Sequence, residues 1–245
     1  MSEEILSRPA PVPDELLTWG PQADHVADLF LGSAERPLVL ALHGGFWRSQ
    51  YDRTHLRHLG RAVADHGYSV ALLEYRRVPG EPELTMDDVR VCLQVVPTFL
   101  HGYFNGQVLL LGHSAGGHLA LWAASICPPD DLVGTIAMAP VSDLRAADEA
   151  HLGGDAVRDF LGGPAIDHPA LDPTALPTPQ TPVTVVLGGR DDVVPAAMSD
   201  GYRIAHPDVT VLVLDSADHY DVIDPMSETW PSIVETLDLV SQVSS

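Results

Sequence analysis

Five short apolar runs constrain the fold of this chain more than any other feature of its sequence. They read PLVLAL, YSVALL, QVLLL, VGTIAM and VTVVL, and they lie at residues 37–42, 68–73, 107–111, 133–138 and 183–187. Each has the length of a strand, and its apolar residues do not alternate with polar ones, which is typical of a parallel strand covered on both faces. Two further strands are expected at 26–30, at an edge of the sheet, and at 209–214.

Longer amphipathic segments separate these runs. Helices are expected at 54–66, 85–100, 115–125 and 227–243. Alternating strands and helices indicate βαβ units, in which helices cover both faces of a mostly parallel sheet. With 245 residues and an apolar share of 45%, the chain is expected to form a single α/β domain over residues 1–245, with an irregular N-terminal segment at 1–24.

One segment, residues 142–181, departs from this rhythm. It is rich in Ala, Asp, Gly and Pro, and only a short helix is expected in it, at about 155–161. A connection of this length between two strands often carries function, so we predict a lid or cap over a site. A plain surface excursion is the alternative.

The charge of the chain limits its partners. Asp and Glu number 34 against 13 Lys and Arg, for a formal net charge of −21. Nucleic acid and anionic membrane surfaces would be repelled, so a small-molecule substrate is the expected partner. The N-terminus lacks a basic stretch followed by an apolar one, and no apolar run is long enough to span a bilayer, which favours a cytoplasmic location. A homodimer is left open.

The two cysteines do not indicate a disulfide framework or a metal site. Cys92 and Cys127 lie in apolar helical surroundings and are expected to be free thiols. The histidines outside the motifs described below have no matching ligand partners in their neighbourhood. We therefore expect no metal and no cofactor.

The stretch LLGHSAGGHL at 110–119 contains a serine between glycines. Gly112-His113-Ser114-Ala115-Gly116 has the form G-x-S-x-G and stands directly after an expected strand and before an expected helix. In such an elbow the serine has an unfavourable backbone conformation, and small neighbours avoid collision with the strand and helix. The hydroxyl is then exposed at the carboxyl end of the sheet, as a nucleophile requires.

A serine needs a base, and the base needs an orienting carboxylate. Asp191 and Asp192 follow the strand at 183–187, and His219 follows the strand at 209–214. Because parallel strands end at one edge of the sheet, these residues should meet Ser114 there. His113 and His118 flank the serine but are expected to be packing groups.

A second glycine motif follows the strand at 37–42, where His43-Gly44-Gly45 opens the loop HGGFWR. Glycines here let backbone amides face inward. With the amide of Ala115, the amides of Gly44 and Gly45 are expected to form an oxyanion hole.

Together these motifs resemble the α/β-hydrolase fold over roughly residues 25–240. The resemblance implies a Ser114, Asp191, His219 triad, because the usual acid pattern G-x-x-D-x-x-V-P selects Asp191 in GGRDDVVP; Asp192 is the competing acid. His219 takes the histidine position, in ADHY.

The HGGFW loop resembles that of arylformamidases, or kynurenine formamidases, with Phe46 where Tyr is more usual. This resemblance implies hydrolysis of N-formylkynurenine to kynurenine and formate. A short-chain carboxylesterase with the same triad is the alternative, and a non-catalytic binding protein on a hydrolase scaffold is a remote one.

Aromatic residues near these loops are candidates for the substrate pocket. Phe46, Trp47 and Tyr75 are expected to border it, Trp47 being equally compatible with the core. Arg48 could meet a substrate carboxylate but is more compatible with a structural ion pair. Glu74, Arg76 and Arg77 are expected to form an internal salt-bridge network.

Overall fold

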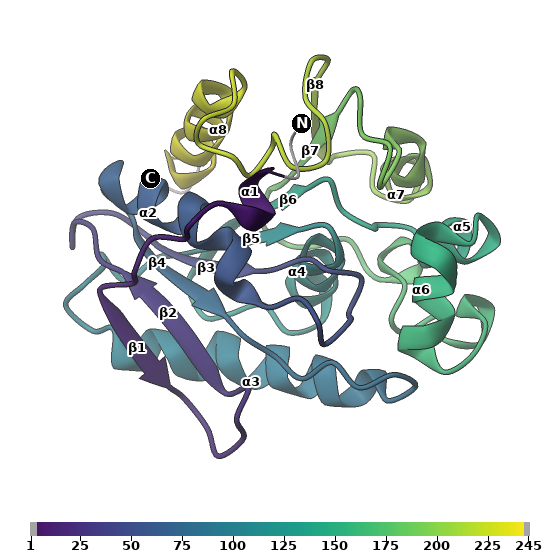
Figure 1. Ribbon diagram of the computed structural model, residues 1–245, viewed down its shortest axis with the longest axis horizontal. Coiled ribbons are helices and arrows are strands. Elements are labelled where there is room, and N and C mark those ends of the chain that lie inside the picture. Colours follow the sequence, from purple (N-terminus) through teal and green to yellow (C-terminus); the bar gives the residue numbers. More distant parts are fainter. Residues whose placement is uncertain (1–3, 243–245) are drawn as a thin grey trace.

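The computed structural model describes residues 4–242, and its centre is an eight-stranded sheet (Figure 1). The strands are β1 (Glu15–Thr18), β2 (Val26–Phe30), β3 (Leu38–Leu42), β4 (Ser69–Leu73), β5 (Val108–His113), β6 (Leu132–Met138), β7 (Val183–Gly188) and β8 (Thr210–Leu214). Their spatial order is β1-β2-β4-β3-β5-β6-β7-β8. The first two strands are antiparallel to their neighbours and the rest are parallel, which confirms the predicted α/β class.

Each of the seven predicted strands is present, with ends within two residues of the expected ones. The N-terminal segment is less irregular than predicted. It contains the short helix α1 (Glu4–Ser7) and the strand β1, which pairs with β2. Three of the four residues of β1 are exposed, so the sequence has no buried apolar run that would predict this strand.

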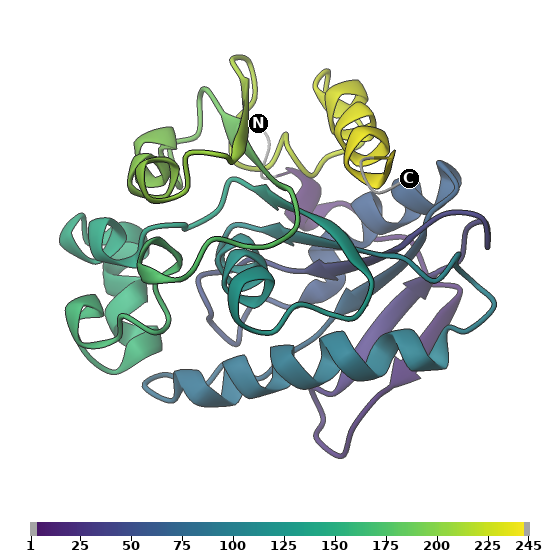
Figure 2. The same ribbon diagram turned by 180° about the vertical axis from the view of Figure 1, so that it is seen from behind.

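Helices cover both faces of the sheet (Figures 1 and 2). The helices α2 (Arg57–Asp65) and α8 (Trp230–Gln242) lie on one face, and α3 (Pro82–Phe99) and α4 (Ala115–Ile126) on the other. Alternate residues of a strand serve the two layers. In β3, Leu40 packs against α3 and α4, whereas Val39 packs toward α2 and α8. Continuous apolar strands are therefore necessary at the centre of this sheet.

The helix bounds agree with the predictions to within three residues. The segment expected to be one helix at 54–66 is a 3-10 turn, η1 (Arg53–Leu56), followed by α2. The expected helix at 227–243 begins at Trp230, and Val243 lies outside the described residues. A short helix after β7, α7 (Asp200–Ala205), was not predicted.

The excursion at 142–181 contains two helices, α5 (Leu144–Glu149) and α6 (Leu152–Leu161), at the right of Figure 1. The first part of α6 is left-handed, and its regular part follows Asp155, where the helix was predicted. Asp148 ties the segment together, because it accepts hydrogen bonds from Arg158 at 2.5 Å and from the amide of Ala165 at 3.0 Å. Its role as a lid stays a prediction.

Candidate active site

The parallel strands bring the predicted site residues to one edge of the sheet. Because β3, β5, β7 and β8 run in the same direction, the loops that follow them open at the same edge. His43 follows β3, Ser114 follows β5, Asp191 follows β7 and His219 follows β8.

The turn at Ser114 has the geometry of a strand-to-helix elbow. Ser114 has φ 56° and ψ −120°, a strained conformation for a residue with a side chain. A Cβ atom at Gly112 would lie 2.1 Å from the carbonyl oxygen of Gly116, and one at Gly116 would lie 2.1 Å from that of Leu42. Only glycine fits at these two positions, which explains the bracketing of the serine.

Asp191, and not Asp192, is paired with His219. An oxygen of the Asp191 carboxylate lies 2.7 Å from Nδ1 of His219, and both side chains are buried. The other carboxylate oxygen accepts the amides of Val193 and Val194 at 2.9 and 2.7 Å, which fixes the orientation of the acid. Nδ1 of His219 therefore carries the proton, and Nε2 is left as the basic nitrogen. Asp192 is exposed.

Ser114 and His219 line the same small pocket, which has about 30 Å³ of free space. The rest of its wall is mainly aromatic and imidazole side chains: Phe46, Tyr51, His55, His113 and Tyr220. Within residues 4–242, Ser114 Oγ and His219 are not joined by a hydrogen bond. Nucleophile and base often close to hydrogen-bonding distance only when substrate is bound.

The glycines of the loop after β3 lie beside the serine. A Cβ atom at Gly44 would lie 2.9 Å from Cβ of Ser114, and Gly45 has φ +111° and lines the pocket. Within residues 4–242, the backbone amides of Gly44, Gly45 and Ala115 donate no hydrogen bond to another protein group. Ala115 is the first residue of α4, where an amide has no partner inside the helix. These amides are available to a substrate oxygen.

A buried network holds this loop. His43 Nε2 lies 2.9 Å from Glu74 Oε1, and the hydroxyl of Tyr75 donates to the carbonyl oxygen of His43 at 2.6 Å. Arg77 also contacts Glu74, whereas Arg76 pairs with Asp88 at 2.5 Å. The predicted internal salt bridges are therefore present, but within residues 4–242 they form two separate groups and not one network. Tyr75 is fully buried and stacked on His43, so the structure places it in the support of the loop and not on the pocket wall.

Of the two places expected for Trp47, the pocket wall and the core, the structure shows the core. Its side chain is 3% exposed and stacks on Phe160 of α6, with ring centroids 4.7 Å apart. It belongs to the core between the loop and the excursion, whereas Phe46 lines the pocket. Arg48 donates to the carbonyl oxygen of Gly153 at 2.8 Å, which is the structural role favoured from the sequence.

Two pocket histidines, His55 and His113, were assigned no catalytic part from the sequence. Burial lowers the pKa of His55 from 6.5 to about 3, and it lowers the pKa of His113 well below 6.5. Both are therefore neutral at neutral pH. Within residues 4–242, neither belongs to a group of three or more side chains that could hold a metal ion. His55 reaches the serine only in the folded chain, whereas His113 directly precedes it in the sequence, so a sequence pattern could point only to His113, by its place in the elbow.

Stability should fall as the pH drops below about 6.5. Burial lowers the pKa of His43 to about 3, of His55 to about 3 and of His118 to about 4, whereas in the unfolded chain these side chains bind protons near pH 6.5. The unfolded state thus binds more protons between these values, and each group should cost about 1.4 kcal/mol of stability per pH unit. Carboxylates with lowered pKa, such as Asp88, add to this loss only below about pH 4.

Urea unfolding at pH 7.5, 6.5, 5.5 and 4.5 measures this dependence, and we expect a steady fall in the free energy of unfolding below pH 6.5. His118→Gln removes one of the buried groups, so its profile should be shallower. A flat profile between pH 7.5 and 4.5 would contradict the neutral burial of these side chains.

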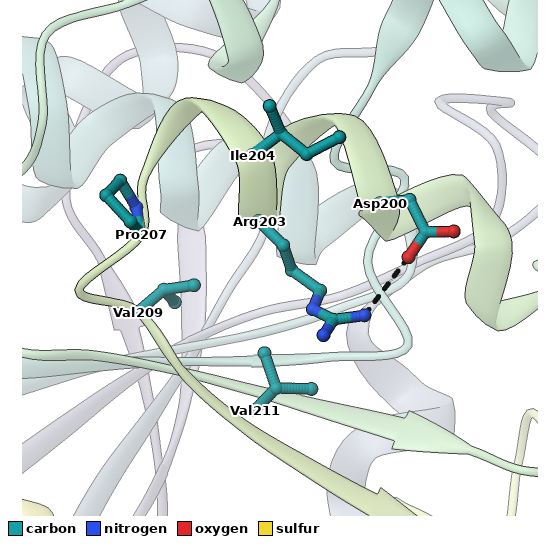
Figure 3. Close-up of a pocket in the computed structure, with 6 residues that line it drawn as sticks. All are labelled: Asp200, Arg203, Ile204, Pro207, Val209 and Val211. Carbon is teal, nitrogen blue, oxygen red and sulfur yellow. Dashed lines mark hydrogen bonds and ion pairs between the residues drawn. The ribbon is translucent and has the colours of Figure 1, made fainter.

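The two largest cavities found within residues 4–242 differ in their relation to this pocket. One of about 690 Å³ adjoins the pocket, shares His219, Val193 and Tyr220 with it, and is lined mostly by polar residues. The other, of about 500 Å³, lies between α7 and β8 (Figure 3). Its charged residues, Asp200 and Arg203, pair with each other at 3.1 Å, and it contains neither serine nor histidine. The candidate active site is therefore the pocket at Ser114, with the polar cavity as its outer part.

None of the helices in residues 4–242 has the length and apolar character needed to cross a membrane.

Comparisons with known proteins agree with this architecture. Esterase B from Lactobacillus rhamnosis, solved with a tributyrin phosphonate inhibitor, superposes with a TM-score of 0.80 at 20% identity, over 99% of this chain and 91% of that one. A putative thioesterase from Silicibacter sp. gives 0.73 at 24% identity over 95% and 89%. An esterase/lipase from an uncultured bacterium gives 0.74 at 20% identity over 98% and 89%. At these identities the similarity shows the fold, that of the α/β-hydrolases.

The search of curated proteins found no significant match. The model of the BD-FAE family matches residues 28–203, more than two thirds of the 245 residues. The match extends from β2 to α7 and so includes the loop after β3, the serine elbow and Asp191. The protein therefore belongs to the BD-FAE family, whose members are α/β-hydrolase-type esterases, and it is a serine hydrolase.

Proposed function

We propose that the protein hydrolyses esters of very short carboxylic acids, with Ser114 as nucleophile, His219 as general base and Asp191 as its orienting acid. One observation carries the proposal: Ser114 and His219, whose Nδ1 is paired with Asp191, line the same pocket of about 30 Å³. This pocket is far smaller than the adjoining cavity of about 690 Å³, which supports a short acyl group beside the serine and a larger leaving group in the outer cavity.

The reaction proceeds in two acyl transfers. Nε2 of His219 takes the proton of Ser114 as Oγ attacks the ester carbonyl, and the amides of Gly44, Gly45 and Ala115 stabilise the oxyanion. His219 then gives the proton to the leaving alcohol as the ester bond breaks. A water molecule, deprotonated by the same nitrogen, attacks the acyl-serine and releases the acid. The adjoining cavity of about 690 Å³ is suited to receive the alcohol.

The ester is favoured over the formamide for two reasons. Arg48 is the candidate partner for the carboxylate of formylkynurenine, but it is hydrogen-bonded to the carbonyl oxygen of Gly153. Trp47 is the candidate partner for the ring of that substrate, but it is packed in the core. In addition, the structural relatives named above are esterases or a putative thioesterase. The polar wall of the outer cavity further supports a polar alcohol as leaving group.

Formamidase activity is the second candidate. The HGGFW loop and a pocket with room for a formyl group favour it. Relative turnover of N-formylkynurenine and p-nitrophenyl acetate decides between the two. A kcat/KM for the formamide that exceeds that for the ester would overturn the preference for esters.

Chain length tests the size of the acyl site. From p-nitrophenyl acetate to the octanoate, kcat/KM should fall by at least about tenfold, since a single surplus methylene in a site of fixed size is already worth about 1–3 kcal/mol. His55→Ala should widen the pocket and reduce this ratio, because His55 forms part of its wall.

His101→Ala is the matched control, since this histidine is exposed on the loop after α3. It should leave the acetate-to-octanoate ratio unchanged. Equal kcat/KM values for the two esters in the wild-type protein would contradict a small acyl site.

A further inference from the structure

One hydrogen bond joins the nucleophile elbow directly to the loop of the base. Nε2 of His113 lies 2.9 Å from the backbone carbonyl oxygen of His219. The two residues are 106 positions apart in the chain, and both are almost fully buried. Since Ser114 follows His113 directly, the contact ties the chain at the nucleophile to the chain at the base.

The contact defines the state of the His113 ring. A carbonyl oxygen only accepts, so Nε2 must carry a proton and donate it. The other nitrogen, Nδ1, is buried without a hydrogen-bond partner among the described residues. Among the described residues, the one hydrogen bond of this ring is therefore the bond to the carbonyl oxygen of His219. Burial and the neighbouring histidines, His219 first among them, lower the pKa of His113 and keep it neutral.

We propose that His113 is a positioning residue, which holds the backbone of His219 so that its imidazole meets the hydroxyl of Ser114. This inference rests on the roles proposed above for Ser114 and His219. The loop of His219 comes from β8, a partly exposed strand at the edge of the sheet, and the elbow comes from the buried strand β5. The hydrogen bond thus fixes a residue of a peripheral loop to the rigid centre of the fold.

A neutral donor is well suited to this position. The rings of His113 and His219 have centroids 4.7 Å apart. During the reaction His219 becomes an imidazolium, and a lysine or arginine at 113 would place a second positive charge against it. A neutral imidazole provides the same hydrogen bond without that repulsion.

The helix that follows the elbow, α4, provides a matched control. His118 of α4 is also fully buried, its Nε2 lies 2.8 Å from the carbonyl oxygen of Leu171, and its Nδ1 also has no partner within residues 4–242. Its bond reaches the excursion and not the loop of the base. Replacing either histidine by phenylalanine removes one buried hydrogen bond of the same kind and keeps an aromatic ring.

The experiment compares kcat, KM and the unfolding temperature of four variants on p-nitrophenyl acetate: His113→Phe, His113→Gln, His113→Asn and His118→Phe. We expect His113→Phe to lower kcat by about tenfold to 100-fold with little change in KM, since small misplacements of catalytic groups cost this much. His118→Phe should lose a similar amount of unfolding temperature and keep its kcat.

The two amide variants separate positioning from packing. The side-chain nitrogen of Gln reaches the place of Nε2, so His113→Gln should recover most of the lost kcat. Asn is shorter, and its nitrogen falls near the place of Nδ1, so His113→Asn should not. This comparison also decides the matter if His113→Phe does not fold.

The outcomes distinguish the inference from the proposed function. If Ser114→Ala retains wild-type hydrolysis, the proposed function fails, and the inference fails with it. If hydrolysis depends on Ser114 but His113→Phe keeps the wild-type kcat, only the inference is overturned. The same holds if His113→Phe does not fold and His113→Gln and His113→Asn have equal kcat values.

Discussion

Replacing Ser114 by alanine should lower kcat for p-nitrophenyl acetate by about 10⁴-fold to 10⁶-fold, as loss of the nucleophile does in enzymes whose triad acts as a unit. The serine follows β5, its strained backbone presents the hydroxyl at the carboxyl edge of the sheet, and no other serine lines the pocket within residues 4–242. The remaining activity would come from the oxyanion amides and from substrate binding. Steady-state kinetics with an active-site titration measure the effect.

Ser142→Ala is the matched control for this prediction. Ser142 is also fully buried, and its hydroxyl donates to Ser199 at 3.0 Å, away from the pocket. Its loss should cost about 1 kcal/mol of stability and leave kcat unchanged. Equal kcat values for wild-type protein and Ser114→Ala would remove Ser114 from the reaction.

Asp191→Asn should lower kcat by about 10⁴-fold while the fold remains intact. One oxygen of Asp191 accepts two backbone amides and the other meets Nδ1 of His219. In the variant the amide oxygen would keep the backbone contacts, and the NH2 group would then face Nδ1. His219 would have to accept there and carry its proton on Nε2, where it could no longer take the proton of Ser114.

The neighbouring carboxylate provides the control for this second prediction. Asp192→Asn makes the same chemical change one residue away, at an exposed side chain, and should alter kcat by less than about twofold, as expected for a surface position. A larger loss of kcat in Asp192→Asn than in Asp191→Asn would show that Asp192, and not Asp191, orients His219.

Local sequence patterns predicted the parts of the fold that depend on burial. The apolar runs of β3 to β7 are covered on both faces, so their composition alone indicates strands. The serine elbow was equally clear, because Gly112 and Gly116 are required by contacts with the adjoining backbone. The carboxyl ends of parallel strands then placed Asp191 and His219 near Ser114.

Features that depend on distant partners were not predictable in the same way. The strand β1 exists because it pairs with β2, and its own residues are mostly exposed. Trp47 and Tyr75 lie close to the site in sequence, but the direction of each side chain is set by its partners, Phe160 and His43. An aromatic residue next to a catalytic loop is as suited to the core as to a pocket.

The histidines show this limit most clearly. His55 enters the pocket from η1, and His113 reaches the carbonyl of a residue 106 positions later. Neither contact leaves a periodic or local pattern in the sequence. The elbow motif revealed the nucleophile, whereas the side chain that precedes it acquires a role only when β8 and its loop are in place.

Mass spectrometry of the protein after reaction with a fluorophosphonate tests the central claim most directly, because it identifies the activated nucleophile itself. We expect a single adduct, on the peptide that contains Ser114, and no adduct in Ser114→Ala. An adduct on a different residue, or none in wild-type protein that hydrolyses p-nitrophenyl acetate, would contradict that claim.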